Sequence, residues 1–522
     1  MTTSGMNGGP EFRSIADIPH FHALFRGGKA AVVVDGGETL SYTTLDDRCR
    51  RFAGFLRSRV VVPGERVVIL LQNVPEFVIA YFGTIAAGCV AVPVNYRLSP
   101  AEVGYILSDC SASLVVTSGE RFGKVAGEEG ARGVRDWLLV DGGGEGSIPF
   151  AAALAANPVP VPEPVAPGDV AVLLYTSGTT GFPKGAMISH RNTLFNVDSC
   201  LATLGYEEED VGLLTLPLFH VTGLHSQLVA LLACGATVVL QKEYDTKQVL
   251  ELIARHRVTA LFLVPAIYKL LTLREDADRC DLSSVRIAAY GGAPMSPETV
   301  LAIRKILPAR LHNCYGLTEC SSLGTVLPAD LALTRSDTVG LPVPGTAAEV
   351  RGPAGDLLSP GEPGELHLCG PHIVQGYFGA PEKTREAIRD GWFRTGDIAR
   401  IDSEGLVTIL DRAKDMINRG GEKVYGLEVE NVLYSYPGVA EAAVFGISHP
   451  VFGEVPASCV IPLPGSNVDP EGLIVFCRGR LADYKVPVSV RVVDRIPRNP
   501  AGKVLKKELR REWENRSREE AR

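Results

Sequence analysis

The chain has 522 residues, which is too long for one hydrophobic core, so two or more domains are expected. Hydrophobic residues make up 46% and charged residues 21%, as in ordinary globular proteins, and no apolar run of about twenty residues predicts a transmembrane helix. With 52 basic and 60 acidic residues the net charge is −8, and no basic stripe indicates a nucleic-acid partner.

The eleven cysteines are scattered and form no Cys-x-x-Cys pair. This spacing predicts free thiols in a reducing, cytoplasmic setting and argues against a zinc site. Residues 1–14 lack the basic, apolar and small-residue segments of a signal peptide. The sequence leaves the oligomeric state open, a homodimer included.

The first part of the chain alternates between strand-like and helix-like segments. Residues 30–34 and 38–42 flank a glycine turn and predict a hairpin. The segments that follow predict a helix at 45–58, a strand at 65–71, a helix at 75–88 and a strand at 90–94. Repeated β–α alternation predicts a layered α/β architecture.

Residues 142–168 are rich in glycine, alanine and proline, which predicts a linker or an extended connection. The connection leads to the short apolar run 170–174, which predicts a buried strand. Hydroxyl residues and glycines follow directly at 175–185, together with Lys184. Glycines let backbone N–H groups approach a ligand, hydroxyls add donors and the lysine supplies charge, so this stretch predicts a phosphate-binding loop.

The loop is not a Walker A motif, in which a lysine directly follows a glycine. Here Phe182 and Pro183 separate Gly181 from Lys184, so the P-loop ATPase fold is not expected. An ordinary surface turn rich in serine, threonine and glycine is the alternative to a phosphate site.

The second half of the chain changes character twice. Another α/β series runs from 192 to about 290. Shorter strands with glycine and proline turns at 339–410 predict a small β-rich subdomain. The remaining stretch, 412–522, has its own β–α pattern and is long enough for a small domain. Its charged end at 505–522 predicts a solvated helix or a frayed terminus.

Five short motifs follow the phosphate loop in order, and each of them is weak when taken alone. They lie at 315–319 (Tyr-Gly-Leu-Thr-Glu), 391–397 (Gly-Trp-Phe-Arg-Thr-Gly-Asp), 411–415 (Asp-Arg-Ala-Lys-Asp), 420–425 (Gly-Gly-Glu-Lys-Val-Tyr) and 497–503 (Pro-Arg-Asn-Pro-Ala-Gly-Lys). With these motifs the chain closely resembles the adenylate-forming superfamily of acyl- and aryl-CoA synthetases, firefly luciferase and nonribosomal-peptide adenylation domains. The resemblance extends from about residue 41 to residue 507.

The resemblance implies a two-domain fold and a two-step reaction. A large N-terminal domain of layered α/β subdomains plus a small β subdomain would occupy 1–411, and a small, mobile α+β C-terminal domain would occupy 412–522. In this family a carboxylate attacks the α-phosphate of ATP to give an acyl-adenylate and pyrophosphate. A thiol, usually that of coenzyme A, then releases AMP. A small-molecule carboxylic acid, ATP, Mg²⁺ and coenzyme A are therefore the implied substrates and cofactors.

The resemblance also implies which residues hold the nucleotide. Thr318 would contact the α-phosphate, and Glu319 would bind Mg²⁺, a hard cation that prefers oxygen ligands. An exposed turn carboxylate is the alternative for Glu319. The other residues expected to bind ATP are Thr176, Ser177, Gly178, Thr179, Thr180, Lys184, Gly292, Asn313, Tyr315, Asp397 and Arg412.

Several residues of this set carry separate expectations. The phosphate loop with Lys184 would hold the β- and γ-phosphates, so that pyrophosphate leaves with its charge compensated. Tyr315 would offer an aromatic face to adenine, or pack in the core instead, and Asn313 would read the adenine edge. Asp397 and Arg412 would hold the ribose, although a turn aspartate often bonds its own backbone.

Lys503 is the expected catalytic lysine, because its cation can bridge the attacking carboxylate and the ATP phosphates. A solvated tail lysine is the alternative. The resemblance implies that the C-terminal domain rotates between the two half-reactions about a hinge at Lys414. Gly420 and Gly421 would then admit the narrow pantetheine arm of coenzyme A, with a plain hairpin turn as the alternative. Lys423 would contact a CoA phosphate or stay a solvated surface lysine.

The segment 216–225 resembles the family's acyl-pocket motif. Residues expected to line the pocket are His220, Val221, Leu224, Gly291 and Cys314. His220 would be a gate or wall of the pocket, or else a packed core histidine. Amino-acid-activating members use an aspartate near this place, and no acidic residue occurs here between 216 and 241, so an amino acid is not the expected substrate.

The apolar lining favours a medium- or long-chain fatty acid, and an aryl acid is the next candidate. Cys314 stands where many members have glycine and would narrow the pocket, which disfavours a bulky aryl acid. Two further alternatives are an acyl-AMP ligase that loads a carrier protein and a non-catalytic acyl-nucleotide binding protein. The latter would be expected to lack Lys503 or Glu319, and both are present.

Overall fold

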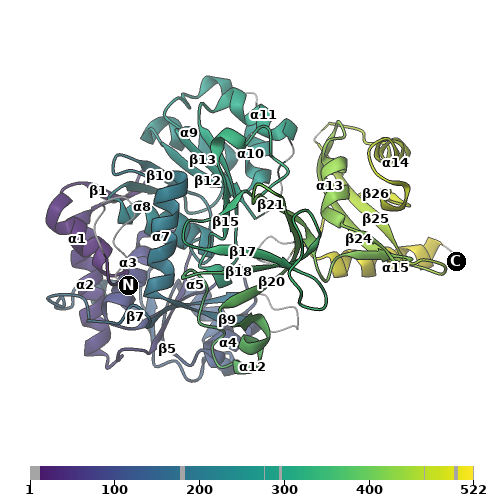
Figure 1. Ribbon diagram of the computed structural model, residues 1–522. Helices are drawn as coiled ribbons and strands as arrows, with labels where there is room; N and C mark the ends of the chain where they lie inside the picture. The colour runs from purple at the N-terminus through teal and green to yellow at the C-terminus, as the bar shows by residue number, and fades with distance from the viewer. Residues whose placement is uncertain are drawn as a thin grey trace.

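The computed structural model describes residues 12–176, 183–274, 277–292, 295, 297–463, 465–498 and 504–520. The chain forms a large N-terminal part and a smaller C-terminal part, which lies to one side of it in Figure 1. Two large sheets and one small sheet build the N-terminal part, and a further sheet with helices packed on it builds the C-terminal part. Among the described residues no helix combines the length and the apolar content needed to span a membrane.

The first large sheet leads into the phosphate loop. Its strands lie in the order β7 (Ile148–Pro149), β6 (Asp136–Leu139), β5 (Ala112–Thr117), β3 (Arg66–Leu70), β4 (Val90–Pro93), β8 (Val170–Thr176) and β9 (Lys184–Ser189). Neighbouring strands are parallel except β9, which runs antiparallel to β8. Helices α2 (Tyr42–Ser58) and α3 (Pro75–Ala86) cover one face, and α4 (Pro100–Asp109) and α5 (Gly119–Val125) cover the other. Both faces are therefore buried, as is usual for parallel sheets.

The second large sheet carries the turns that supply most of the remaining site residues. Its strands lie in the order β16 (Leu341–Pro342), β15 (Thr325–Leu327), β14 (Arg310–Tyr315), β13 (Ile287–Gly291), β12 (Ala260–Leu263), β10 (Val211–Leu214), β11 (Thr237–Leu240), β1 (Ala30–Val34) and β2 (Thr39–Ser41). Helices α9 (Thr246–His256), α10 (Pro265–Thr272) and α11 (Pro297–Ile306) cover one face. On the other face, α7 (His190–Leu204), a π-helix at Thr222–Val229 and α8 (Ala230–Ala233) share one apolar core with the first sheet.

The small sheet joins the two parts of the molecule. It contains β17 (Ala347–Arg351), β18 (Gly364–Cys369), β20 (Trp392–Ile401), β19 (Ile388–Arg389) and β21 (Val407–Arg412), and α12 (Pro381–Ala387) precedes β19. The C-terminal sheet contains β23 (Glu422–Val424), β22 (Ile417–Arg419), β25 (Gly453–Pro462), β24 (Val439–His449) and β26 (Val490–Val492). Its helices are α13 (Gly426–Tyr434), α14 (Pro470–Arg478) and α15 (Lys506–Glu520).

The α/β layering, the β1–β2 hairpin and the small β-rich sheet confirm the architecture predicted from the sequence. Two local predictions need correction. The connection at 142–168 contains the edge strand β7 and the short helix α6 (Phe150–Leu154), because Ile148 pairs with Leu138 at the open edge of the first sheet. Extended structure therefore covers only part of that connection.

The charged C-terminal segment is not a solvated helix. Helix α15 buries Leu509 and Trp513 against the C-terminal sheet, and the ring of Trp513 lies edge-on to Phe445 with 5.6 Å between centroids. The two residues are four apart, so they lie on one face of the helix. A narrow apolar face within a strongly charged segment is enough to hold the helix on the domain.

Candidate active site

The phosphate loop connects two paired strand ends. Thr176 closes β8 and Lys184 opens β9, and the two residues pair across the antiparallel ladder. The Lys184 ammonium lies over the ring of Tyr377, 5.1 Å from its centroid. Within the described part of the chain, no carboxylate approaches Lys184 closely enough to form an ion pair, so its charge is available to a phosphate. The loop residues between the strands lie outside the described ranges, namely Ser177, Gly178, Thr179 and Thr180, and so does Lys503.

Thr318 and Glu319 lie on a short 3₁₀ helix, Thr318–Cys320, directly after β14. The turn that carries them is strained, because Ser321 and Ser322 both adopt positive φ angles, 55° and 123°. Gly316 is required at the start of this turn, since a β-carbon there would lie 1.5 Å from the Ser322 carbonyl oxygen. The backbone is thus strained at the second and third residues after Glu319, the predicted metal ligand.

Three neighbouring elements hold this turn in place. The Ser321 hydroxyl donates to the His372 carbonyl at 3.0 Å. The Ser226 hydroxyl, from the π-helix, donates to the Ser322 hydroxyl at 2.6 Å. The Leu323 N–H donates to the Asn196 side-chain oxygen on α7 at 3.1 Å. These anchors compensate the backbone strain and fix where Thr318 and Glu319 lie.

Asp397 is held between two donors. The Tyr315 hydroxyl donates to Asp397 Oδ2 at 2.6 Å, and Arg412 Nε lies 2.7 Å from Asp397 Oδ1. Asp397 and Arg412 also pair across β20 and β21. Burial raises the pKa of Tyr315 well above its usual value, and the Asp397 charge raises it further, so the phenol stays protonated and donates. Residues predicted from three separate motifs are thus in direct contact.

Asn313 and the glycines have structural partners of their own. The Asn313 amide donates to the Thr338 carbonyl at 2.9 Å, and its side chain is buried. Gly292 has φ of 80°, a conformation that favours glycine. Gly291 pairs with Cys314, and a β-carbon on Gly291 would lie 2.4 Å from the Cys314 carbonyl oxygen, so glycine permits the close approach of β13 and β14.

The expected acyl-pocket residues surround the start of the π-helix. Val221, Leu224 and Cys314 are buried and belong to one apolar core cluster. His220 is partly exposed, and its Nδ1 accepts from the Thr222 N–H at 3.4 Å. π-Helical turns are rare and frequently occur at functional sites. The structure thus groups these three apolar side chains in one cluster, and their role in an acyl pocket stays a prediction.

The π-helix also buries polar side chains on the side away from solvent. His225 lies with Nε2 at 3.3 Å from the Tyr81 hydroxyl, and Gln227 donates to the Phe262 carbonyl at 3.2 Å. Burial lowers the pKa of His225 to about 4, so this ring is neutral near pH 7. His225 lies within the 216–225 motif, but the sequence alone assigned no role to His225 or Gln227.

The predicted hinge lies between two sheets. Strand β21 ends at Arg412 and β22 begins at Ile417, and Lys414 between them is exposed. Gly420 and Gly421 have φ of 62° and 101° in the turn between β22 and β23, so this hairpin requires glycine whatever it binds. Lys423 on β23 is exposed.

Asp411 on β21 contacts the C-terminal part. Its Oδ2 accepts from the Gly426 N–H at 2.5 Å, at the start of α13. Lys506 lies 4.0 Å from Asp411 and 2.9 Å from Glu430. Burial raises the pKa of Asp411, and the Lys506 cation opposes that rise. This small buried charge cluster is where the two parts touch.

Glu319 offers a suitable, but single, carboxylate for Mg²⁺. Magnesium in nucleotide sites is commonly held by one or two carboxylates together with substrate phosphates, rather than by a cage of protein ligands. Within the described residues no group of three His, Cys, Asp or Glu side chains could hold a metal ion. The residues present therefore fit a metal that arrives with the nucleotide.

Tyr377 was not among the residues selected from the sequence. Its hydroxyl donates to Glu319 Oε1 at 2.8 Å, and its ring faces the Lys184 ammonium. It lies in the loop between β18 and α12, which carries none of the quoted motifs. The adjacent Gly376, with φ of 142°, and Gly379, with φ of 63°, are local signs of a specially shaped backbone.

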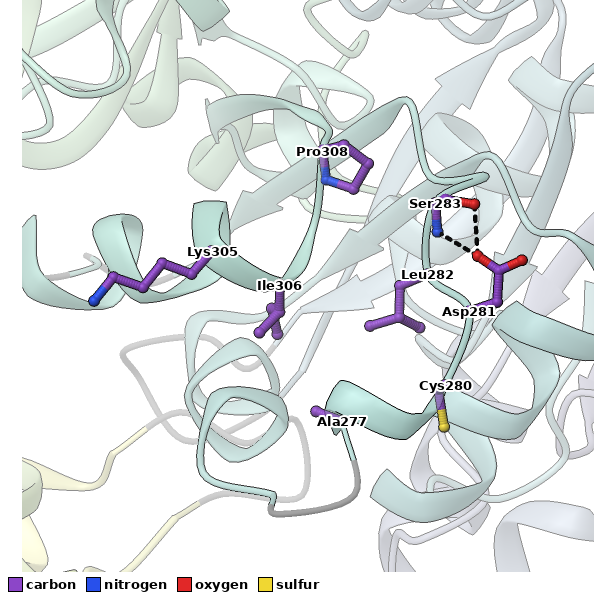
Figure 2. A pocket seen from close by; sticks show the side chains of 8 residues that line it. All are labelled: Ala277, Cys280, Asp281, Leu282, Ser283, Lys305, Ile306 and Pro308. Carbon is purple, nitrogen blue, oxygen red and sulfur yellow. Dashed lines mark hydrogen bonds between the residues drawn. The ribbon is translucent and has the colours of Figure 1, made fainter.

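A separate cavity of about 350 Å³ lies elsewhere on the second sheet (Figure 2). Its lining comes from the segment before β13 and from the end of α11, including Asp281, Ser283 and Lys305. These residues lie at the amino ends of β13 and β14, whereas Gly291, Cys314 and Tyr315 lie at the carboxyl ends. The cavity is therefore not part of the site described above.

Comparisons with known proteins identify the family to which this chain belongs. A family described as AMP-binding enzyme matches residues 22–378, and its C-terminal domain matches residues 428–503. The chain is 38% identical to a feruloyl-CoA synthase of Amycolatopsis sp over 93% of this chain and 96% of that protein. It is 35% identical to a long-chain-fatty-acid–CoA ligase of Mycobacterium tuberculosis over 91% of this chain and 93% of that protein.

The three-dimensional likeness agrees with the sequence likeness. A crystal structure of ATP-bound MatB from Rhodopseudomonas palustris has a TM-score of 0.86 and 31% identity, covering 95% of this chain and 99% of that chain. The fold is that of adenylate-forming enzymes, with a large N-terminal and a small C-terminal domain. The chain belongs to the AMP-binding enzyme family and, within that adenylate-forming superfamily, to the acyl-CoA synthetases. Enzymes of this kind use ATP, Mg²⁺ and coenzyme A.

Proposed function

We propose that this enzyme joins a carboxylic acid to coenzyme A through an acyl-adenylate, and that the tail of this acid carries no charge. The observation that carries the proposal is the contact of Tyr377 with both Lys184 and Glu319. Through that one side chain, the strand that leaves the phosphate loop lies beside the turn that carries the predicted metal ligand. This pair of opposite charges suits a polyanionic ligand with a bound metal ion.

In the first half-reaction the chain's own residues compensate negative charge. Lys184 and the phosphate loop would bind the β- and γ-phosphates, and Thr318 would donate to the α-phosphate. Asp397, held by Tyr315 and Arg412, would accept from the ribose hydroxyls. When bound at Glu319, Mg²⁺ would supply positive charge to the phosphate oxygens. Lys503 would hold the attacking carboxylate against the α-phosphate, and pyrophosphate would leave.

The second half-reaction needs room for a thiol. We place the domain boundary at 411/412 and the hinge at Lys414. Rotation there would withdraw Lys503 and bring Gly420 and Gly421 to the site, with Lys423 toward a CoA phosphate. The contacts of Asp411 with Gly426 and Lys506 would have to break or rearrange during that rotation. A buried contact near the hinge is therefore expected to influence the balance of the two arrangements.

A medium- or long-chain fatty acid is the first candidate substrate. The expected pocket residues Val221, Leu224 and Cys314 are apolar and buried, and the nearby His225 is neutral, so none of these four described residues would balance a second carboxylate. An aryl acid is the second candidate, because relatives at 38% identity are named feruloyl-CoA synthase. The eleven free cysteines support a cytoplasmic location.

A panel of acids with ATP, Mg²⁺ and coenzyme A tests the proposal. Saturated fatty acids of increasing length, ferulate, benzoate, malonate and an amino acid are compared by AMP release and by thioester formation. We expect AMP and acyl-CoA in equal amounts with apolar acids and none with malonate or the amino acid. AMP release that needs a carrier protein in place of coenzyme A would favour the carrier-loading alternative. ADP formation with every acid would contradict the proposal.

A further inference from the structure

Tyr377 lies in a loop that is built against the phosphate-loop strand. The Met187 N–H donates to the Gly376 carbonyl at 2.9 Å, and the Phe378 N–H donates to the Gly185 carbonyl at 2.8 Å. The Tyr377 N–H donates to the Thr384 hydroxyl oxygen at 2.9 Å. Backbone bonds on both sides of Tyr377 thus fix this residue relative to β9, whose first residue is Lys184.

The Tyr377 side chain makes two different contacts with opposite charges. Its ring lies 5.1 Å from the Lys184 ammonium, within the range of a cation–π interaction. Its hydroxyl donates to Glu319 Oε1 at 2.8 Å. The side chain is 8% exposed, so both contacts are shielded from water.

The contacts of Tyr377 explain how Lys184 and Glu319 can both stay available for their ligands. Lys184 and Glu319 carry opposite charges, and a direct ion pair between them would remove the cation needed for phosphate and the carboxylate needed for metal. In the described part of the molecule neither residue forms a salt bridge. The ring of Tyr377 satisfies the cation without a hydrogen bond, while its hydroxyl uses one of the two Glu319 oxygens. The other oxygen can still bind a metal.

We propose that Tyr377 is a positioning residue of the nucleotide site, whose hydroxyl orients Glu319 toward Mg²⁺ and whose ring keeps Lys184 directed to the phosphates. The proposal rests on the proposed function for the identity of the metal nucleotide. Groups that orient a metal ligand typically change metal affinity or activity by about 10- to 100-fold when they are replaced. Tyr377 acts through Glu319 and Lys184 and is not itself expected to touch substrate.

Two substitutions separate the hydroxyl from the ring. Tyr377→Phe keeps the ring over Lys184 and removes the donor to Glu319, whereas Tyr377→Leu removes both. Tyr42→Phe is the matched control, because Tyr42 is also buried and its hydroxyl donates to the Ala236 carbonyl at 2.6 Å, in a different part of the fold. Thermal unfolding of each variant checks that the fold is retained.

The experiment measures metal binding as well as the rate of pyrophosphate exchange. Mn²⁺ binding is measured by the electron paramagnetic resonance of the free ion, in the presence of a non-hydrolysable ATP analogue. We expect Tyr377→Phe to raise the dissociation constant for Mn²⁺ about tenfold or more, and to raise the Mg²⁺ concentration needed for half-maximal pyrophosphate exchange. Excess Mg²⁺ should restore the exchange rate of Tyr377→Phe. Tyr377→Leu should also raise the KM for ATP at saturating Mg²⁺, because Lys184 is released.

Wild-type Mn²⁺ affinity in Tyr377→Phe, or an equal loss in Tyr42→Phe, would overturn the proposal. Should Tyr377→Phe not fold, Thr384→Val removes the acceptor of the Tyr377 N–H and must raise the Mn²⁺ dissociation constant in the same direction, and no change would again overturn it. The binding measurement needs no carboxylic acid. A wild-type enzyme that binds the metal nucleotide but activates no acid would contradict the proposed function and leave the role of Tyr377 tested by Mn²⁺ alone.

Discussion

At the residue scale, Asp397 shows how the site gathers separate motifs. Its two oxygens contact Tyr315 and Arg412, and its side chain is 5% exposed. The pairing of Asp397 with Arg412 across two strands fixes the carboxylate on rigid backbone rather than on a loop. A carboxylate held in this way can accept from both hydroxyls of a ribose, which two neutral acceptors would do more weakly.

We expect Asp397→Asn to weaken ATP binding, because an amide has one acceptor oxygen and no charge to pair with Arg412. Loss of a charge-assisted hydrogen bond costs about 1.5–3 kcal/mol, so the KM for ATP should rise about tenfold or more. Pyrophosphate exchange at varied ATP measures it. Asp402→Asn is the control, since Asp402 also pairs with an arginine, Arg335, in the N-terminal part. An equal rise in both variants would argue against a ribose contact.

At the element scale, the π-helix and the Glu319 turn behave as one unit. The Ser226–Ser322 hydrogen bond links the helix that borders the acyl residues to the strained turn beyond Glu319. Both serines are buried, so breaking this bond leaves a hydroxyl without water to replace its partner. If the acid binds along this helix as proposed, we expect it to influence the position of the turn that carries Glu319.

We expect Ser226→Ala to lower stability by about 1–3 kcal/mol and to lower kcat for pyrophosphate exchange, since the Ser322 hydroxyl loses its partner and the turn loses an anchor. Denaturant unfolding and steady-state kinetics measure the two effects. Ser458→Ala is a matched control, because Ser458 is fully buried on β25 and its hydroxyl has no hydrogen-bond partner in the described structure. Equal losses in the two variants would show that Ser322 does not depend on Ser226.

Local sequence patterns predict most of the helices and strands, but they do not predict the long-range contacts between them. The sequence predicts the glycine turns, the β–α alternation and the ordered motifs, because each of these features is formed by residues that are close together in the chain. The apolar face of α15 was hidden by many charged residues, and edge strand β7 forms only because Leu138 lies beside it. Local sequence patterns do not identify Tyr377, because its role depends on contacts with Lys184 and Glu319, which are distant in the chain.

At the scale of the whole molecule, buried histidines make stability depend on pH. Burial lowers the pKa of four of them to about 4, namely His190, His225, His312 and His372. An unfolded histidine binds its proton near pH 6.5, so the unfolded chain binds more protons than the folded one between these values. The stability that these residues contribute is complete above pH 6.5 and is lost as the pH falls toward 4.

We expect His372→Phe to reduce this loss by about 1.4 kcal/mol per pH unit between pH 6.5 and 4, because one protonation is removed. His372 suits the test, since neither ring nitrogen has a partner among the described residues and its ring already packs against Phe195. Urea unfolding at about pH 7.5 and about pH 5 measures the difference. An unchanged pH dependence would mean that His372 binds its proton equally in the folded and the unfolded state.

At the same scale, the proposed function assigns adenylate formation and thioester formation to different arrangements of the two parts of one chain. The measurement that tests this most directly follows Lys503→Ala through each half-reaction separately. We predict that the variant loses acid-dependent exchange of pyrophosphate into ATP, yet still makes thioester from supplied acyl-adenylate and coenzyme A. Exchange that survives in Lys503→Ala, or thioester formation that is lost together with it, would contradict the account.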